Sequence, residues 1–438
     1  IWQSIRDSEL VAERNVEQLY DPDAGTFLAD RFVRGTCPNS ECRAPDQYGD
    51  SCDKCGHTHS PAELIDPVST LSGARPEVRT AAHLFIELEK LHEFLEEWTQ
   101  SGRHLQAEVA NYLKGHFLNQ PLRDWDISRP APYFGFEIPD SPGNYWYVWF
   151  DAPIGYIAST AQWCKRHGES LDDWWRSQDT EIHHFIGKDI TYFHTLFWPG
   201  MLKTAGFSLP TKVRIHGFLT VGGEKMSKST GEVVDPLELA EKHGPDAFRY
   251  FVMREMTVGQ DSEFTAELFL TRYNTELGND LGNLVSRILN MTGRYAEGIV
   301  PAATVDEEPE HELRRTWDET RDPALETFDG YQYNFGIEKT FAFIRAINRY
   351  VEVRAPWKLA KSEDAADAPR LATSLAVMAE ALRLANALLA PVMPGINAKI
   401  NELLGLPPTE TWDEFLLSWG TTLEGNQLGE KTILFPRA

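Results

Sequence analysis

Four closely spaced cysteines have the residue type and spacing of a metal site. They form two pairs within twenty residues, the second pair as a Cys-x-x-Cys-Gly turn, and they are Cys37, Cys42, Cys52 and Cys55. Such a turn directs two thiolates to one point, and a second pair completes the four sulfur ligands of a tetrahedral zinc ion. Because four thiolates leave no open coordination position, we expect a structural rather than a catalytic zinc ion. His57 and His59 follow closely and are alternative ligands, although surface histidines after such a turn are more often bystanders.

A lysine-rich loop is the second stretch that could do chemistry. It covers 221–230, VGGEKMSKST, and follows an alternating strand-like run over 216–220. Its paired glycines permit the positive φ angles of a tight turn. Lys225 and Lys228 could neutralise the charge that builds on a phosphoryl group and its leaving pyrophosphate. The ordinary alternative for a short basic loop is a solvated hairpin.

An aromatic segment could enclose a small apolar ligand. The run 145–151, YWYVWFD, predicts a strand buried on both faces of a parallel sheet, and a helix follows over 154–166. Ligands of such sheets bind beyond the carboxyl ends of the strands. Trp149, Pro153 and Tyr156 therefore lie where an apolar amino acid could be enclosed, although core packing alone is the usual explanation of an aromatic run.

The next predicted strand ends in a turn whose backbone could bind a ligand. This turn, 187–189, has the sequence GKD, and its aspartate is predicted to cap a helix over 190–205. On that helix His194 lies one turn after Ile190 and one turn before Trp198, so the three share a face. A histidine on an aromatic face is usually a hydrogen-bonded core residue, and spacing alone leaves that alternative open.

From Thr265 onward the pattern changes to long amphipathic helices. The apolar stripe of one such helix consists of Leu277, Leu281, Leu284 and Ile288. A second stripe holds Asn279, Asn283 and Arg287, each four residues from the last. This spacing puts two amides and a guanidinium on one face, where they could hydrogen-bond unstacked bases. Taken alone, a polar stripe is usually a solvated helix face.

Aromatic and basic residues further along could support such a surface. Pro356-Trp357 supplies a ring on which a base could stack, and Arg345, Arg349 and Arg354 provide local positive charge. The strongly acidic segment 306–329 is expected to face away from a nucleic acid. Earlier in the chain, short strands are predicted over 19–36, and scaffold helices over 85–98 and 105–117.

Bulk properties bound the function. The chain has 438 residues, 42% of them hydrophobic and 11% aromatic, which indicates about three domains with large buried cores. No apolar run approaches the ~20 residues of a membrane span and no signal-peptide pattern occurs, so we expect a soluble, intracellular protein. A net charge of −24 argues against indiscriminate nucleic-acid binding, although a local basic site is compatible with it. The first residue is Ile1, apparently inside a helix because Ile1, Ile5, Leu10 and Val11 recur on one face, which is typical of a fragment.

The loop sequence resembles a family signature. Lys225, Met226, Ser227, Lys228 and Ser229 spell KMSKS, the signature of the class I aminoacyl-tRNA synthetases. The flanking sequence narrows the resemblance to the methionyl-tRNA synthetase family, from about Leu19 to Pro436. It implies an α/β fold, in which a partial Rossmann-type parallel-sheet catalytic domain carries a zinc-knuckle connective insertion and is followed by an α-helical anticodon-binding domain.

The resemblance also implies a division of the chain and roles for its residues. The end of the first nucleotide-fold half would cover 1–18, the connective domain 19–122, the second half of the catalytic domain 123–216, the KMSKS loop and stem-contact region 217–263, and the anticodon-binding domain 264–438. The methionine pocket would be lined by Trp149, Pro153, Tyr156, Phe193, His194 and Trp198. ATP would be bound by Gly187, Lys188, Asp189, Lys225, Met226, Ser227, Lys228 and Ser229, with Lys225 and Lys228 catalytic. The anticodon would be bound by Asn279, Asn283, Arg287, Pro356 and Trp357.

The implied function is that of a methionine-tRNA ligase. Its substrates would be methionine, ATP with Mg²⁺, and tRNA(Met), and we expect a cytoplasmic monomer without membrane contact. Trp149, Tyr156 and His194 favour methionine over another large apolar amino acid.

Two departures from the family pattern matter. The first cysteine pair is spaced CxxxxC where the family usually has CxxC, and no H-x-G-H occurs in the sequence, although class I synthetases pair such an HIGH-type motif with KMSKS. We therefore expect this chain to need the HIGH-containing part in order to form an adenylate. The alternative is a noncatalytic, zinc-containing RNA-binding module derived from a synthetase.

Overall fold

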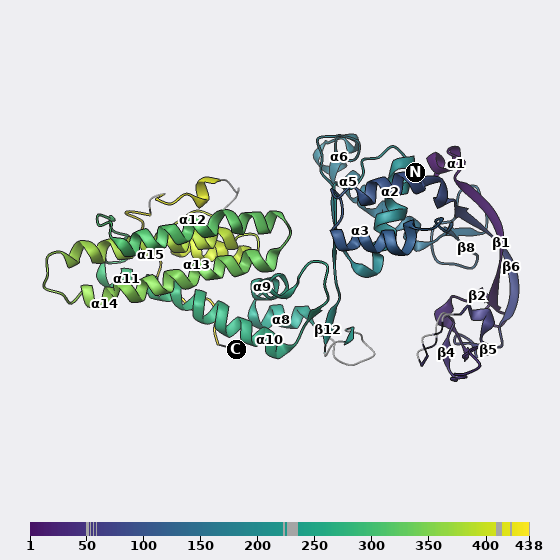
Figure 1. Ribbon diagram of the computed structural model, residues 1–438, viewed down its shortest axis with the longest axis horizontal. Helices are drawn as coiled ribbons and strands as arrows, with labels where there is room; N and C mark the ends of the chain where they lie inside the picture. Colours follow the sequence, from purple (N-terminus) through teal and green to yellow (C-terminus); the bar gives the residue numbers. More distant parts are fainter. Residues whose placement is uncertain are drawn as a thin grey trace. The chain divides into compact units, whose positions relative to one another are not determined.

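The computed structural model describes residues 1–49, 52, 54–55, 57, 59–221, 224–225, 235–408, 414–420 and 423–437. The chain divides into two compact units, Ile1–Ile215 and His216–Ala438 (Figure 1). The first is a mixed α/β unit and the second is mainly helical, in agreement with the predicted fold class.

The first unit contains short helices around several small sheets. Its helices are α1 (Trp2–Asp7), α2 (His92–Gln100), α3 (Ala107–Leu113), α4 (Val148–Asp151), α5 (Ile154–His167), α6 (Leu171–Trp175) and α7 (Trp198–Thr204), with 3₁₀ or π segments η1 (Asp30–Phe32), η2 (Pro61–Glu63), η3 (Leu88–Leu91), η4 (Lys114–Leu118), η5 (Lys188–Ile190) and η6 (Phe193–Phe197). Its strands are β1 (Val11–Asp21), β2 (Thr26–Phe27), β3 (Val33–Thr36), β4 (Gln47–Tyr48), β5 (Ile65–Ser69), β6 (Glu77–Ile86), β7 (Trp125–Asp126), β8 (Ser128–Pro130), β9 (Asn144–Trp146), β10 (His183–Gly187) and β11 (Lys212–His216).

A long antiparallel ladder joins two parts of this unit. β1 pairs with β6 from Val11 opposite Ile86 to Tyr20 opposite Glu77, and the two strands lie side by side in Figure 1. Beyond one end of the ladder lies the small sheet β4-β3-β5, with its own apolar cluster. The helix predicted to run from Ile1 through Val11 was wrong in its second half, because α1 ends at Asp7 and the next residues enter β1. The helix predicted over 85–98 likewise begins only at η3, since Phe85 and Ile86 end β6.

The aromatic run 145–151 does not form the predicted doubly buried strand. β9 ends at Trp146 and pairs antiparallel with β8, while Val148–Asp151 forms α4. The rings of Trp146 and Phe150 stack with centroids 4.4 Å apart. Trp146 lies at the end of β9 and Phe150 lies in α4, so the run stacks these two rings across a strand-to-helix junction rather than along one strand. Phe150 belongs to the main core of the unit, together with Trp125 and Trp198.

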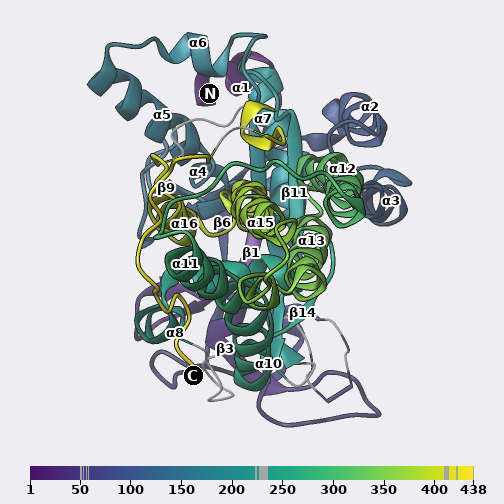
Figure 2. The ribbon, with the colours of Figure 1, turned by 90° about the vertical axis from the view of Figure 1, so that its left-hand side faces the viewer.

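The second unit is a helical body preceded by a small sheet. Its elements are β12 (Leu219–Val221), β13 (Glu224–Lys225), α8 (Pro236–His243), α9 (Pro245–Glu255), β14 (Ser262–Glu263), α10 (Ala266–Arg272), η7 (Tyr273–Gly282), α11 (Asn283–Tyr295), α12 (Glu308–Asp329), α13 (Tyr333–Arg354), α14 (Pro356–Leu359), α15 (Asp367–Leu389), α16 (Pro394–Leu403) and η8 (Glu414–Leu417). Figure 2 looks nearly along α12, α13 and α15, which pack together.

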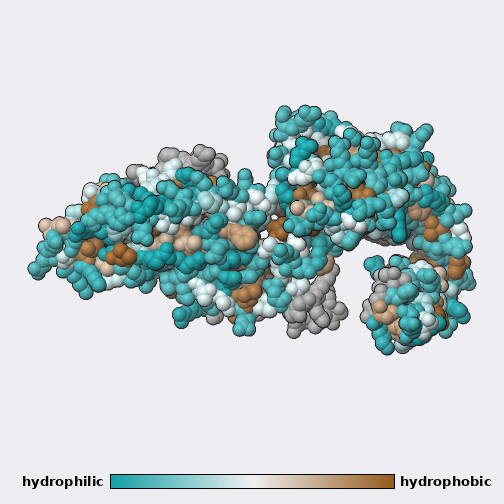
Figure 3. Space-filling model, viewed as in Figure 1, coloured by the Kyte–Doolittle hydropathy of each residue, from teal (hydrophilic) through white to brown (hydrophobic). Residues whose placement is uncertain are grey.

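α15 is the central helix of this body. Sixteen of its residues, from Thr373 to Leu389, are buried. By length and composition α15 could cross a membrane, but 83% of its most apolar window is buried inside the unit. Burial of that kind is expected for the core helix of a bundle. The face drawn in Figure 3 is mainly hydrophilic.

A buried ion-pair network connects α12 to α13. The carboxylate of Glu310 has no solvent exposure, and it accepts hydrogen bonds from the Tyr350 hydroxyl at 2.5 Å and from Arg354 Nε at 2.7 Å. Arg354 also donates to Glu307 at 2.8 Å. Burial opposes ionisation of Glu310, but the bonds from Arg354 and Tyr350 lower its pKa overall. The prediction that Arg354 supplies free positive charge was therefore wrong, because its guanidinium is neutralised inside the unit.

Removing the arginine from this network should destabilise the second unit strongly. Arg354→Ala leaves a buried carboxylate without its cation, and we expect a loss of about 3–5 kcal/mol in the free energy of unfolding. Denaturant unfolding measures this loss. The matched control is Arg315→Ala, which removes an exposed pair with Glu308 and should cost below about 1 kcal/mol. A similar small cost for both variants would contradict the interpretation.

Candidate active site, metal centre and RNA-binding groove

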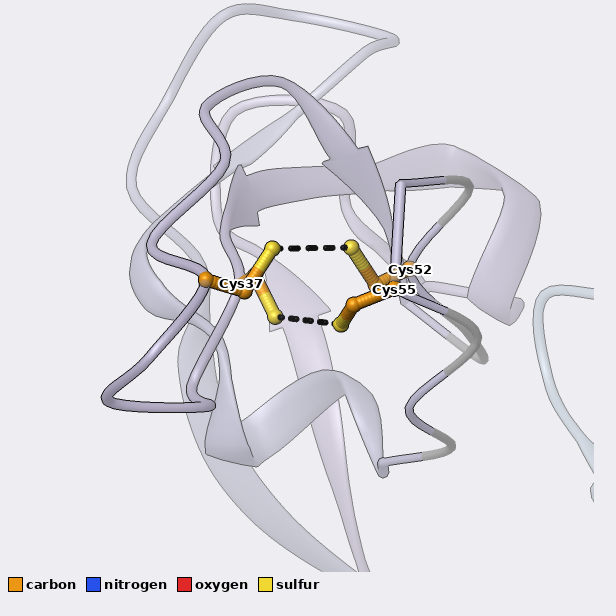
Figure 4. A group of neighbouring side chains, drawn as sticks. Cys37, Cys52 and Cys55 are labelled. Atoms are coloured by element: carbon orange, nitrogen blue, oxygen red, sulfur yellow. Dashed lines mark hydrogen bonds between the residues drawn. The ribbon is translucent and has the colours of Figure 1, made fainter.

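The four predicted cysteines meet at one point in the first unit. Their sulfur atoms all lie within 4.8 Å of one another, and Figure 4 shows the two pairs facing each other. Cys37 Sγ is 3.9 Å from Cys55 Sγ, and Cys42 Sγ is 3.8 Å from Cys52 Sγ. The longer spacing of the first pair is taken up by a turn in which the Cys42 amide donates to the Asn39 carbonyl at 3.0 Å. Among the described residues, this group contains no histidine.

The cluster fits a tetrahedral zinc ion. Zn–S bonds of about 2.3 Å in a tetrahedron put the sulfur atoms roughly 3.8 Å apart, which matches the two measured contacts. Cys37 and Cys52 are buried, and burial raises the pKa of the Cys37 thiol to about 12. A divalent cation supplies the positive charge that such a thiol needs in order to ionise. The cysteines would hold the ion and join the two loops that carry them.

The aromatic residues predicted to enclose a ligand form a connected group. His194 lies in η6 and Tyr156 in α5, and the Tyr156 hydroxyl is 2.9 Å from His194 Nε2. The Trp149 ring stacks on Phe193 with centroids 4.6 Å apart. Trp198, at the start of α7, is fully buried. The structure thus brings together residues from α4, α5, η6 and α7, and all lie in the first unit.

The remaining predicted residues lie in the turns beside this group. Pro153 is buried in the turn before α5 and its carbonyl accepts from the Tyr156 amide at 3.1 Å. Gly187 is the last residue of β10, and Lys188 and Asp189 follow it in η5. The expected capping role of Asp189 was wrong, because η5 begins at Lys188 with Gly187 as its N-cap and without a side-chain cap. The helical segment therefore begins two residues earlier than a cap at Asp189 requires.

His184 belongs to the same group, and the sequence analysis missed it. It lies on β10, is buried, and its Nε2 accepts a hydrogen bond from the Trp198 indole at 3.1 Å. Its ring is 5.0 Å from Tyr156 and 5.8 Å from His194, centroid to centroid. The alternation of β10 could have identified it, since His184 and Ile186 point to the same buried face.

Both imidazoles are held neutral. Burial lowers the pKa of His184 to about 4, with a further contribution from His194. Burial also lowers the pKa of His194, although the hydrogen bond to the Ile190 carbonyl opposes this. That bond, 3.1 Å long, places a proton on His194 Nδ1, so His194 Nε2 accepts from the Tyr156 hydroxyl. The site therefore offers aromatic surface and polar atoms without net charge.

The lysine-rich loop lies mostly outside the described residues. Lys225 ends β13, whose backbone pairs antiparallel with β12. Met226, Ser227, Lys228 and Ser229 lie outside the described part of the chain. Their predicted roles stay predictions.

The predicted nucleic-acid stripe lines a groove in the second unit. Asn279 lies in η7, and Asn283 and Arg287 lie in α11. All three line a groove of about 740 Å³. The Arg287 guanidinium lies 5.8 Å from the Trp357 ring centroid and donates to Glu352 at 2.5 Å. Pro356 is buried and begins α14, which presents the partly exposed Trp357 beside the stripe.

The sequence model of the family described as tRNA synthetases class I (M) matches residues 1–289. The chain belongs to this family. It is 52% identical over 417 residues to the methionine-tRNA ligase of Rhodopirellula baltica, a match that covers 94% of this chain and 59% of that protein. Methionine-tRNA ligase 1 of Sorangium cellulosum is 48% identical, over 93% of this chain and 58% of that protein. The chain therefore spans somewhat under two thirds of the length of these relatives.

Solved structures of the same family share the fold. Methionyl-tRNA synthetase from Mycobacterium tuberculosis in its free state has a TM-score of 0.77 at 28% identity, over 100% of this chain and 80% of that one. The form bound by methionyl-adenylate has a TM-score of 0.79 at 29% identity, over 99% of this chain and 79% of that one. These likenesses confirm the class I synthetase fold that the KMSKS sequence indicates.

The neutral state of His184 makes the first unit sensitive to acid. Its pKa is lowered from about 6.5 in the unfolded chain to about 4 in the folded one. Between these values the unfolded chain binds the proton and the folded chain does not, so stability falls as the pH falls. We expect the wild type to lose about 2 kcal/mol more than His184→Gln between pH 7 and 4.5. Denaturant unfolding at both pH values tests this, because Gln can accept from Trp198 but does not titrate there, and equal losses would contradict it.

The cysteine cluster should bind one metal ion per chain. We expect elemental analysis of the purified protein to give about one zinc, falling to near zero in Cys37→Ser because three sulfur ligands bind far more weakly. The control is Cys164→Ser, which removes a buried thiol on α5 outside the cluster and should leave the zinc content unchanged. Retention of zinc by Cys37→Ser would show that another residue completes the site.

Proposed function

We propose that the intact protein is a methionine-tRNA ligase. The observation that supports this most directly is the aromatic group around Tyr156 and His194, in a chain 52% identical to the methionine-tRNA ligase of R. baltica. The fold is shared with a synthetase bound by methionyl-adenylate, which adds support for methionine and ATP as substrates.

The chemistry of the group suits the methionine side chain. A thioether is polarisable and flexible, and it packs favourably against ring faces and edges. Trp149 and Phe193 provide stacked rings, while the neutral His194 and the Tyr156 hydroxyl provide polar atoms without charge. A charged side chain would find no counter-ion among these atoms, so the group favours an uncharged amino acid.

The reaction needs positioning and charge stabilisation rather than a side-chain nucleophile. The methionine carboxylate attacks the α-phosphate of ATP, the bond to pyrophosphate breaks, and methionyl-adenylate forms. A hydroxyl of the terminal adenosine of tRNA(Met) then attacks the methionyl carbonyl, and AMP leaves. Lys228, supported by Lys225, would stabilise the charge on the phosphates, and Mg²⁺ would accompany ATP. Gly187, Lys188 and Asp189 would lie near the nucleotide.

The same proposal assigns the rest of the chain. The end of the first nucleotide-fold half would cover 1–18, and the connective domain with its structural zinc would cover 19–122. The second catalytic half would cover 123–216, the KMSKS and stem-contact region 217–263, and the anticodon-binding domain 264–438. Asn279, Asn283, Arg287, Pro356 and Trp357 would recognise the anticodon. We propose a cytoplasmic monomer.

One observation favours a second candidate. The sequence has no H-x-G-H motif, so a noncatalytic zinc-containing RNA-binding module is the alternative function for this chain. The two candidates share the zinc site and the RNA-binding groove and differ only in adenylate formation.

Methionine-dependent ATP–pyrophosphate exchange distinguishes the candidates. It should be measured on this chain alone and with the HIGH-containing part supplied as a separate polypeptide. We expect exchange only with both parts present, and a fall of at least about 10²-fold in Lys228→Ala, because the lysine stabilises charge only in the transition state. The control Lys242→Ala changes an exposed lysine at the end of α8 and should retain exchange. Absence of exchange from two parts shown to associate would overturn the ligase proposal.

A further inference from the structure

The RNA-binding groove has a second wall that the predicted stripe does not include. One wall is formed by η7 and α11, and the other by the C-terminal tail, residues 431–437. Figure 2 shows the tail, in yellow, running beside α11. The groove is continuous along both walls, so anything bound to the stripe also faces the tail.

Three contacts fix the direction of the tail. The Ser286 hydroxyl on α11 donates to the Thr432 carbonyl at 3.1 Å. Nearer the start of the helix, the Phe435 ring lies 6.0 Å from the Tyr273 ring, and a Cβ on Gly282 would come within 3.2 Å of Phe435. The tail therefore runs antiparallel to η7 and α11. Lys431 precedes Thr432 and therefore lies on the side of the Ser286 contact that is away from Phe435.

The groove is a basic, amide-rich surface on an acidic protein. The residues that line it are Asn274, Gly278, Asn279, Gly282, Asn283, Ser286, Arg287, Asn290, Lys431, Ile433, Leu434, Phe435, Pro436 and Arg437, of which three are basic and none is acidic. The whole chain has a net charge of −24. Arg287 pairs with Glu352 beside the groove, so the excess positive charge of the lining comes from Lys431 and Arg437, and it attracts a polyanion locally while the remaining surface repels it. Amides and guanidinium groups can hydrogen-bond base edges, and lysine binds phosphate as a point charge.

Asn290 and Lys431 extend the groove beyond the three-residue stripe. Asn290 is exposed and lies three residues after Arg287, which places it on the same face of α11 one turn further on. Lys431 is also exposed and reaches this end of the groove on the opposite wall. The lining of the groove thus includes an amide and an ammonium group in addition to the three residues of the stripe.

We propose that this end of the groove binds the nucleotide next to the anticodon triplet. Lys431 binds its backbone phosphate and Asn290 hydrogen-bonds its base. The Ser286–Thr432 contact is the positioning contact, because it holds the tail against α11 and so sets the distance between the two walls. The inference rests on the proposed function and adds to it a wider RNA site than the triplet.

RNA binding by the full chain tests the proposal. The probe is a fluorescent hairpin RNA that carries the methionine anticodon in its loop, with binding followed by anisotropy at several salt concentrations. We expect Lys431→Ala to bind roughly three- to tenfold more weakly, with the slope of log K against log salt smaller by about 0.7, the value for one single-strand phosphate contact. Asn290→Ala should bind about tenfold more weakly but keep the salt slope, because it loses a base contact. A change of the nucleotide beside the triplet should weaken the wild type and leave Asn290→Ala unaffected.

Controls separate this inference from the proposed function. Lys399→Ala removes a partly exposed lysine that pairs with Glu402 on α16 and should bind like the wild type with an unchanged salt slope. Ser286→Ala should weaken RNA binding. The slope of log K against log salt should change less in this variant than in Lys431→Ala. Wild-type binding by both Lys431→Ala and Asn290→Ala, with binding lost in Asn283→Ala and Arg287→Ala, would overturn the inference and leave the proposed function standing. Equal binding of the hairpin and of one with a scrambled anticodon would overturn both.

Discussion

The exclusion of water from two histidines is the constraint on which the site of the first unit depends. A buried imidazole is stable only when it is neutral and its two nitrogen atoms have partners. His194 meets this condition through the Ile190 carbonyl and the Tyr156 hydroxyl, and His184 Nε2 accepts from the Trp198 indole. These bonds connect β10, η6, α5 and α7. The hydrogen bonds to the two imidazoles therefore set both the polarity of the site and the packing of the four elements, so a change in one changes the other.

The second unit differs from this site, because it buries charged side chains instead of neutral ones. Glu310 has no solvent exposure, and Arg354 and Tyr350 satisfy its carboxylate. The two arginines differ in burial rather than in pairing, because Arg354 is buried against Glu310 whereas the Arg287 pair with Glu352 is at the surface, beside Trp357. Arg354 was predicted to provide local positive charge because its partner Glu310 lies 44 residues earlier and cannot be identified from local spacing.

Features that depend on residues close together in the sequence could be predicted, and features that depend on contacts between distant residues could not. The cysteine cluster and the Asn279, Asn283 and Arg287 stripe depend on local spacing, and the structure places both sets together as the spacing predicts. The aromatic run failed as a strand because the chain leaves β9 after Trp146 and enters α4, where Phe150 packs into the core of the unit, a contact that the local pattern does not indicate. His184 was missed because its partner Trp198 belongs to another element 14 residues away. The tail that forms the second wall of the groove could not be located either, since Ser286 and Thr432 are 146 residues apart.

The distribution of charge reconciles an acidic chain with the proposed RNA ligand. Nonspecific affinity for nucleic acid comes mainly from phosphate neutralisation, and a net charge of −24 makes most of this surface repulsive. A groove whose lining residues include three cations and no carboxylate concentrates attraction at one place. Affinity then depends on correct docking in the groove, because an RNA displaced from it meets like charge. Repulsion elsewhere on the surface therefore raises selectivity at a cost in total affinity.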